Sequence, residues 1–165
     1  MDSVTLVQLL TKKGLTITTA ESCTGGLIAA AITDVPGAST VFHEGFISYS
    51  NDAKIKRLSV LADSLAEYGA VSEQVAKEMA VRAQKVAGAD LAISVTGIAG
   101  PGGGSADKPV GTVWIGLSYD GDVMAQRFLF EGNREDVRLQ VVETAFKLVV
   151  NSIDKFLESP TSSSS

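Results

Sequence analysis

The 165-residue sequence contains only one cysteine, Cys23, and one histidine, His43. A single cysteine excludes an internal disulfide framework, and a reducing compartment such as the cytoplasm suits such a chain. Structural zinc sites take four Cys or His ligands, so this inventory also disfavours bound zinc. We therefore expect a cytoplasmic protein that works without a metal.

Long apolar runs and excess positive charge are also lacking. No run approaches the ~20 apolar residues that a membrane-spanning helix needs. Residues 1–4 have neither the basic nor the apolar region of a signal peptide. The net charge of −5, from 14 Lys and Arg against 19 Asp and Glu, disfavours the broad basic face that nucleic-acid binding requires. We expect no membrane and no direct nucleic-acid partner, although a few local groups can still hold a small anion.

The apolar pattern that is present predicts an α/β fold: a three-layer α/β/α sandwich around a mixed, mostly parallel sheet. One domain is expected over residues 1–158, with a disordered polar tail at 159–165. A hairpin around Asp120 and Gly121 makes the sheet mixed. Asn51, Ser72 and Asn133 are the predicted N-caps of three helices. Strands are predicted at 15–19, 41–50 (with a bulge at Gly45), 91–96, 112–119 and 123–130, and helices at 4–13, 26–33, 51–58, 61–68, 73–87 and from 134 onward.

The first unusual segment is TTAESCTGG, residues 18–26. Ser22 follows a predicted strand and precedes a helix, at the edge where open α/β sheets bind ligands. Backbone N–H groups freed by Gly25 and Gly26 can hold an anion or a developing oxyanion. Alternatively, Ser22 or Thr24 is simply a helix cap and the glycines allow tight packing.

The second segment is YSNDAK, residues 49–54. If Asn51 caps the helix, Lys54 falls at position N3, where the helix dipole disfavours an ammonium. Partial burial lowers the pKa of a lysine further, and a neutral lysine can act as a base. The alternative is a solvated lysine beside Lys56 and Arg57.

The third segment, TGIAGPGGGSADKPVG at residues 96–111, has six glycines and two prolines among sixteen residues. Structureless connections of this length are usually functional or disordered. Because it follows a predicted strand, it overhangs the same sheet edge as Ser22 if the strands are parallel. It lacks the Gly-Lys-Ser/Thr ending of a P-loop, and a flexible linker is the alternative. Its candidate binding residues are Thr96, Gly97, Gly100, Gly102, Gly103 and Ser105.

Three further features concern charge and nucleophiles. Arg134 and Arg138 lie one helical turn apart and can clamp a phosphate, or else form surface pairs with Glu131 or Glu135. Cys23 is a rival nucleophile to Ser22, but without a histidine in its motif a packed thiol is favoured. His43 is expected to be a packed or surface residue.

Taken together, the segments TTAESCTGG, GFISYSNDAK, YGAVSEQVAKEMA, SVTGIAGPGGGSADKPVGTVW and GNREDVR resemble the CinA C-terminal domain family over about residues 5–157. Members that stand alone are similar to nicotinamide-nucleotide amidohydrolases. The resemblance implies an α/β/α fold and hydrolysis of nicotinamide mononucleotide to nicotinate mononucleotide and ammonia, without metal or cofactor. It also implies that Ser22 is the nucleophile and Lys54 its base. Larger relatives carry an N-terminal domain resembling molybdopterin-binding proteins, which this chain is expected to lack.

In this interpretation Thr24 orients Ser22 and the ring of Tyr49 lies near the cationic pyridinium. The expected partner is a small pyridine mononucleotide, and a homo-oligomer is compatible with the sequence. Two other hypotheses stay open: a non-catalytic nucleotide-binding module, and an interaction domain in competence or DNA-damage pathways. Release of ammonia separates the enzyme from both.

Overall fold

The computed structural model describes residues 2–158, with side chains as far as residue 155, so the predicted tail at 159–165 lies outside the described residues. Five strands form one sheet in the order β2-β1-β3-β4-β5. β1 is parallel to β2 and β3, whereas β4 is antiparallel to β3 and β5, so four of the five strands run in one direction. The predicted mixed, mostly parallel sheet is confirmed. The strands are β1 (Ile17–Glu21), β2 (Phe42–Ile47), β3 (Leu91–Gly97), β4 (Thr112–Tyr119) and β5 (Asp122–Leu129).

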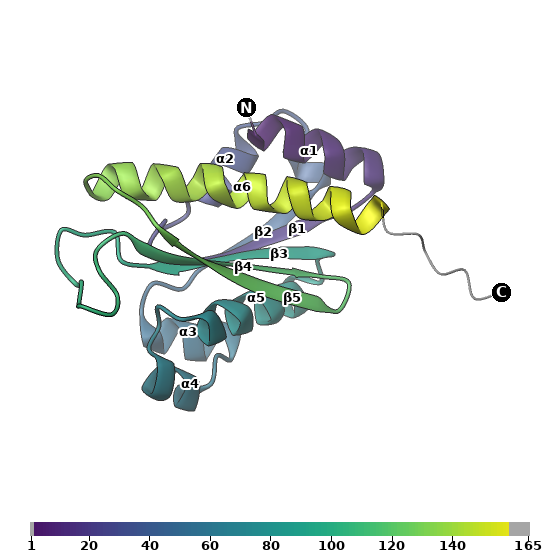
Figure 1. Cartoon of the computed structure of the whole chain (residues 1–165). Coiled ribbons are helices and arrows are strands. Elements are labelled where there is room, and N and C mark those ends of the chain that lie inside the picture. Colours follow the sequence, from purple (N-terminus) through teal and green to yellow (C-terminus); the bar gives the residue numbers. More distant parts are fainter. Residues whose placement is uncertain (1, 159–165) are drawn as a thin grey trace.

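Helices cover both faces of this sheet, which gives the predicted three layers (Figure 1). One face carries α1 (Asp2–Lys13), α2 (Leu27–Thr33) and α6 (Arg134–Glu158), and the other carries α3 (Asn51–Leu58), α4 (Ala62–Tyr68) and α5 (Glu73–Ala87). A short 3₁₀ turn, Ala38–Thr40, leads into β2. The sheet separates two apolar cores, a larger one beneath α1, α2 and α6 and a smaller one beneath α5.

The central strand β3 is buried on both sides, as its apolar run predicts. Helix α5 buries three alanines, Ala76, Ala80 and Ala83, whose small side chains let the helix approach the sheet closely. A Cβ added to Gly116 of β4 would lie 2.8 Å from the carbonyl oxygen of Ala76. This close approach fixes α5 against the strands whose ends carry the candidate site.

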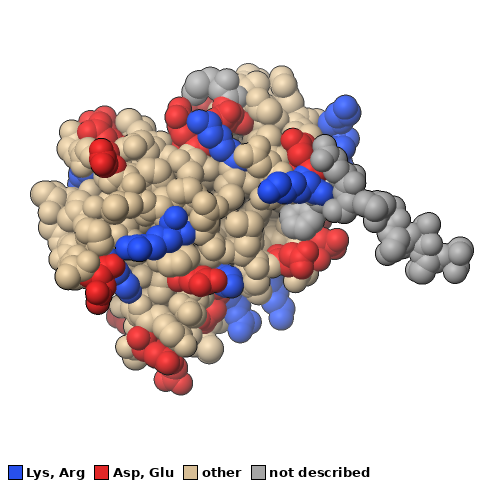
Figure 2. Space-filling view, in the orientation of Figure 1, with Lys and Arg blue, Asp and Glu red and all other residues tan. Residues whose placement is uncertain are grey.

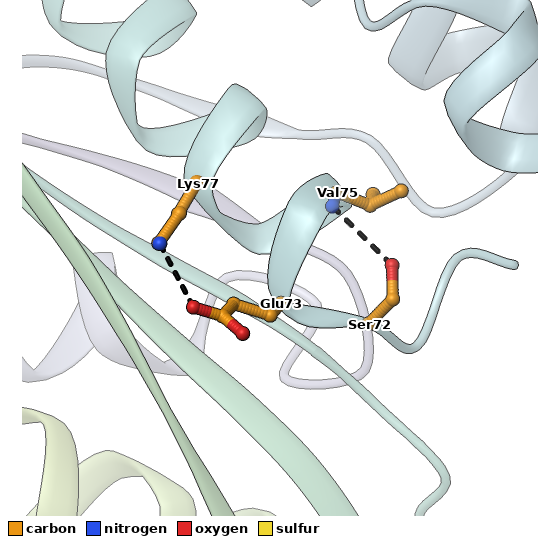
Figure 3. A network of polar contacts seen from close by, with 4 residues as sticks. All are labelled: Ser72, Glu73, Val75 and Lys77. Atoms are coloured by element: carbon orange, nitrogen blue, oxygen red, sulfur yellow. Dashed lines mark hydrogen bonds and ion pairs between the residues drawn. The ribbon is translucent and has the colours of Figure 1, made fainter. Parts of the chain in front are cut away.

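Two of the predicted helix caps are confirmed. The Ser72 hydroxyl accepts a hydrogen bond from the Val75 N–H at 3.3 Å, and an ion pair of 2.8 Å joins Glu73 to Lys77 one turn further on (Figure 3). Asn133 accepts from the Asp136 N–H, and the Asp136 carboxylate accepts from the Asn133 N–H in return. These reciprocal bonds satisfy N–H groups that the first helical turn leaves without partners.

The predicted Asn51 cap is wrong. Ser50 is the N-cap of α3, and its hydroxyl accepts from the Ala53 N–H at 3.0 Å. Both residue types cap well, so the local sequence alone does not choose between them. The shift places Lys54 at N4 instead of N3.

The bulge predicted at Gly45 lies in the pairing of β2 with β1. Ile17 pairs with Phe42 but Thr19 pairs with Gly45, so β2 uses one more residue than β1 over this interval. A Cβ at Gly45 would lie 2.7 Å from Thr19 Oγ1 and 3.0 Å from the Phe42 ring. Position 45 therefore leaves little room for a side chain. β1 itself ends two residues later than predicted, at Glu21.

The face of the molecule drawn in Figure 2 intersperses Lys and Arg with Asp and Glu, and most of it is uncharged. Within residues 2–158, no helix combines the length and the apolar content that crossing a membrane requires.

Candidate active site

Ser22 lies immediately after β1, at the edge of the sheet where β1 and β3 both end. Its N–H donates to the Val95 carbonyl at 3.0 Å, so the backbone of Ser22 is tied to the neighbouring strand. Because β1 and β3 are parallel, the glycine-rich loop that follows β3 starts at this same edge. The predicted juxtaposition of Ser22 with this loop is confirmed.

Lys54 reaches the same end of the sheet from α3, which covers the face opposite to α2 (Figure 1). Side chains on a helix lean toward its N-terminus, so the long side chain at N4 extends back over the first turn. Its Nζ lies 3.0 Å from Ser22 Oγ, 2.9 Å from the Ser48 carbonyl oxygen and 3.2 Å from that of Tyr49. The side chain is fully buried, with 1% of the residue exposed, and this burial lowers the pKa of Lys54 from 10.5 to about 8.

The three neighbours of the Lys54 amine define what it can do. An ammonium would donate to all three oxygens. A neutral amine has two N–H groups and one lone pair, and the two carbonyl oxygens can only accept. The lone pair of the neutral form is therefore left facing the Ser22 hydroxyl. In the neutral form, this geometry allows a proton to pass from Ser22 Oγ to Lys54 Nζ.

A cavity of about 280 Å³ opens in front of this pair. Its size is near the lower end of the range for small-molecule sites. Eight residues predicted for the site line it: Ser22, Tyr49, Lys54, Gly97, Gly100, Gly102, Gly103 and Arg134. The sequence offered Cys23 as a rival nucleophile and Asn51 as a helix cap, and both line the cavity. The remaining lining residues are Ala70, Ile98 and Ala99.

Three predicted hydroxyl residues are engaged elsewhere. Thr24 Oγ1 donates to Glu21 Oε1 at 2.7 Å, and Thr96 Oγ1 donates to the Ala70 carbonyl at 2.8 Å. Ser105 Oγ accepts from the Lys108 N–H within the loop. None of these three residues is among those that line the cavity.

The two predicted glycines after Thr24 shape the turn that carries Ser22. Gly25 has a φ of 57° and its N–H donates to the Ser22 carbonyl at 3.0 Å. Gly26 has a φ of 106° and is the N-cap of α2, without a side-chain cap. Positive φ angles of this kind favour glycine.

The two arginines of α6 have different surroundings. Arg134 donates to the Gly100 carbonyl at 2.8 Å and to the Tyr49 hydroxyl at 3.0 Å, so it joins the loop to the exposed Tyr49 beside the cavity. Arg138 donates to the carbonyl oxygens of Cys23 and Thr24, at 3.0 and 3.1 Å. Among the described residues, neither forms the surface ion pair with a glutamate that the sequence left open.

Cys23 and His43 are not organised for catalysis. Burial raises the pKa of the Cys23 thiol to about 11, which keeps it protonated and a weak nucleophile at neutral pH. His43 is exposed on the edge strand β2. Within the described part of the chain, no three His, Cys, Asp or Glu side chains gather as metal ligands would.

Glu21 is the residue that sequence reasoning missed. It is fully buried, and its carboxylate accepts from Thr24 Oγ1, from the Ile28 N–H at 2.8 Å and from the Ala29 N–H at 3.0 Å. The available signal was an acidic residue at the end of a buried strand, just before a helix that begins with glycine. Such a helix needs an external acceptor for its first N–H groups.

The fold and the site at the ends of β1 and β3 define an α/β protein in which a buried lysine contacts a serine at a small cavity. The family model of the CinA C-terminal domain matches residues 3–153, and the chain belongs to that family. Nicotinamide-nucleotide amidohydrolase PncC of Enterobacter agglomerans is 57% identical over 139 residues, covering 84% of this chain and 85% of that protein. A CinA-like protein of Citrifermentans bemidjiense is 56% identical over 133 residues, covering 81% of this chain but only 32% of the relative. The chain thus corresponds to about a third of that longer protein.

Solved structures agree with the fold. The competence/damage inducible protein CihA of Agrobacterium tumefaciens is 43% identical with a TM-score of 0.87, covering 92% of this chain and 95% of that one. A CinA superfamily protein from Klebsiella pneumoniae is 36% identical with a TM-score of 0.91, covering 93% and 96%.

Proposed function

We propose that this protein hydrolyses the carboxamide of nicotinamide mononucleotide, giving nicotinate mononucleotide and ammonia, with Ser22 as the nucleophile and Lys54 as its base. The observation that carries the proposal is the 3.0 Å approach of the buried Lys54 amine to Ser22 Oγ at the cavity wall. The substrate is suggested by the similarity to PncC, which extends over most of both chains.

The first half of the reaction forms an ester on the enzyme. Neutral Lys54 takes the hydroxyl proton as Ser22 Oγ attacks the carboxamide carbon, and the carbonyl oxygen becomes an oxyanion. The Lys54 ammonium then gives this proton to the departing nitrogen, which leaves as ammonia when the C–N bond breaks. Lys54 is again neutral, and Ser22 carries the nicotinoyl group.

The second half returns Ser22 to its starting state. A water molecule attacks the ester carbon while Lys54 accepts its proton, and the same proton then passes back to Ser22 Oγ as the ester bond breaks. The product is released as the carboxylic acid, which gives its remaining proton to water and becomes the carboxylate. The same base serves both halves because its pKa lies close to neutral pH.

Backbone N–H groups at the cavity wall are the candidate donors to the oxyanion. The N–H groups of Ser22 and Gly25 already donate to the Val95 and Ser22 carbonyls. The Cys23 N–H, next to Ser22 on a residue that lines the cavity, remains as a candidate. One such donor typically contributes about 3 kcal/mol to stabilising the transition state.

The ends of the substrate also have candidate partners. The Tyr49 ring lines the cavity and can face the pyridinium cation. The phosphate carries about two negative charges. Arg134 is its candidate partner, because its cationic side chain lines the cavity. The glycines at 100, 102 and 103 add backbone N–H groups beside it.

The test is ammonia release from nicotinamide mononucleotide by the purified protein, with nicotinate mononucleotide identified as the second product. Ser22→Ala should abolish release, whereas Ser39→Ala, which removes an exposed serine from the 3₁₀ turn, should not change it. A non-catalytic nucleotide-binding module would bind the nucleotide and release no ammonia. That result would reject the proposed function.

A further inference from the structure

The turn of residues 22–26, which carries Ser22, is held by two charged groups. From within the core, the Glu21 carboxylate accepts from the Thr24 hydroxyl and from the first free N–H groups of α2. Gly26 offers α2 no side-chain cap, so Glu21 supplies the acceptor that the N-terminal turn of α2 needs. A carboxylate at this end of a helix is also favoured by the helix dipole.

The Arg138 guanidinium, from α6, holds carbonyl oxygens of the turn. It donates to Cys23 O through Nε and to Thr24 O through Nη2. The Ser22 carbonyl accepts from the Gly25 N–H. All three successive carbonyls after Glu21 therefore have a donor. The Thr24 carbonyl also accepts from the Leu27 N–H at 3.0 Å, whereas the donor to the Cys23 carbonyl comes from Arg138 on a distant helix.

We propose that Glu21 and Arg138 are positioning residues that fix the Ser22 turn, Glu21 through the Thr24 hydroxyl and the N-terminus of α2, and Arg138 through the carbonyl oxygens of the turn. Neither needs to touch the substrate: Arg138 is not among the residues that line the cavity at Ser22, and Glu21 is fully buried. Lys54 is fixed separately by the carbonyls of Ser48 and Tyr49. The two residues thus set where Ser22 Oγ lies relative to an amine that is already held in place. The catalytic consequence rests on the proposed function, but the structural claim does not.

The structural claim is tested by the single thiol in the turn. Cys23 is 5% exposed, so its rate of labelling by a small thiol reagent under native conditions reports opening of the turn. Arg138→Ala and Glu21→Gln should each raise this rate at least tenfold. Glu21→Gln keeps the side-chain size, so a faster rate there cannot come from a cavity left by a smaller side chain. Lys147→Ala, which removes an exposed cation from the same helix, should leave the rate unchanged.

Global unfolding is separated from opening of the turn by circular dichroism melts, and labelling is measured well below each variant's Tm. If Arg138→Ala does not fold, the labelling rate is measured on Arg138→Lys instead. This variant keeps the charge but loses the planar guanidinium that spans two carbonyls. Labelling of Arg138→Lys and Glu21→Gln at the wild-type rate would overturn the proposal. This readout holds even if the wild-type protein releases no ammonia, which would reject only the proposed function.

The catalytic consequence is tested with two substrates, the nicotinamide mononucleotide and the riboside that lacks its phosphate. A positioning role predicts that Arg138→Ala lowers kcat by a similar factor, about 10-fold or more, for both substrates with little change in KM. Added guanidinium ion should restore part of that kcat, because it can occupy the vacated position. A loss confined to the nucleotide and seen mainly in KM would show instead that Arg138 binds phosphate and would overturn the proposal.

Discussion

The pH dependence of turnover follows directly from the buried amine. Burial lowers the pKa of Lys54 to about 8, and only the neutral form can accept the Ser22 proton. The neutral fraction is then about 1% at pH 6, about 9% at pH 7 and about 90% at pH 9. The sign is that of a base: kcat/KM is lost as the pH falls through 8 and reaches a plateau above it. Between pH 6 and pH 9 we expect kcat/KM to rise about 90-fold.

The assay is initial ammonia release at substrate concentrations well below KM, measured across this range. The phosphate of the nucleotide titrates near pH 6, so the riboside serves as a control that lacks this group and should show the same rise. Lys54→Ala should lose the plateau and keep only a slow rate. A profile that is flat or falling between pH 6 and pH 9 for both substrates would refute the assignment of Lys54 as the base.

Three other expectations use the same assay. Cys23→Ala should retain activity within a few-fold of the wild type, because a thiol whose pKa burial has raised to about 11 is protonated at neutral pH; loss of activity comparable to that of a Ser22 variant would make Cys23 the nucleophile. Arg134→Ala should raise KM for the mononucleotide and leave the riboside nearly unchanged, since the guanidinium at the cavity is placed to meet a phosphate; equal effects on both substrates would argue against a phosphate site there. Exhaustive chelation should leave activity intact, and a loss that only one divalent ion restores would contradict the Ser-Lys chemistry.

Local patterns predicted most of the architecture. Several predicted features depend only on residues that are neighbours in the sequence. They are the apolar run of β3, the positive-φ turn at Asp120 and Gly121, and the caps at Ser72 and Asn133. Their sequence signals therefore match the structure. The hairpin and the parallel β1–β3 pair then follow from short connections and crossover helices.

The errors occurred where two local solutions are nearly equal in energy. Ser50 and Asn51 both make good caps, and in the structure the Ser50 side chain is the one that caps α3. β1 extends to Glu21 because its last residues pair with β2 and β3 on both sides, which the alternation of Leu15 to Thr19 does not reveal.

The site was predictable only in part for a related reason. Ser22 and Lys54 are 32 positions apart, and the resemblance to the family, rather than any local pattern, paired them. The contacts of Arg138 with Cys23 and Thr24 span more than a hundred residues. They depend on how α6 lies over α2, which no helix pattern specifies. Glu21 was missed because a buried carboxylate at a strand end has no recognisable motif until its partners are placed.

The central claim is that Ser22 and Lys54 act as one unit, and a double-mutant comparison of ammonia release tests it most directly. Their 3.0 Å contact means that removing either group disables the same proton transfer. Ser22→Ala and Lys54→Ala should therefore each lower kcat by about three orders of magnitude or more, and the double variant should be little slower than either single variant. Losses that multiply in the double variant would contradict the account, because they would show that the two residues contribute independently.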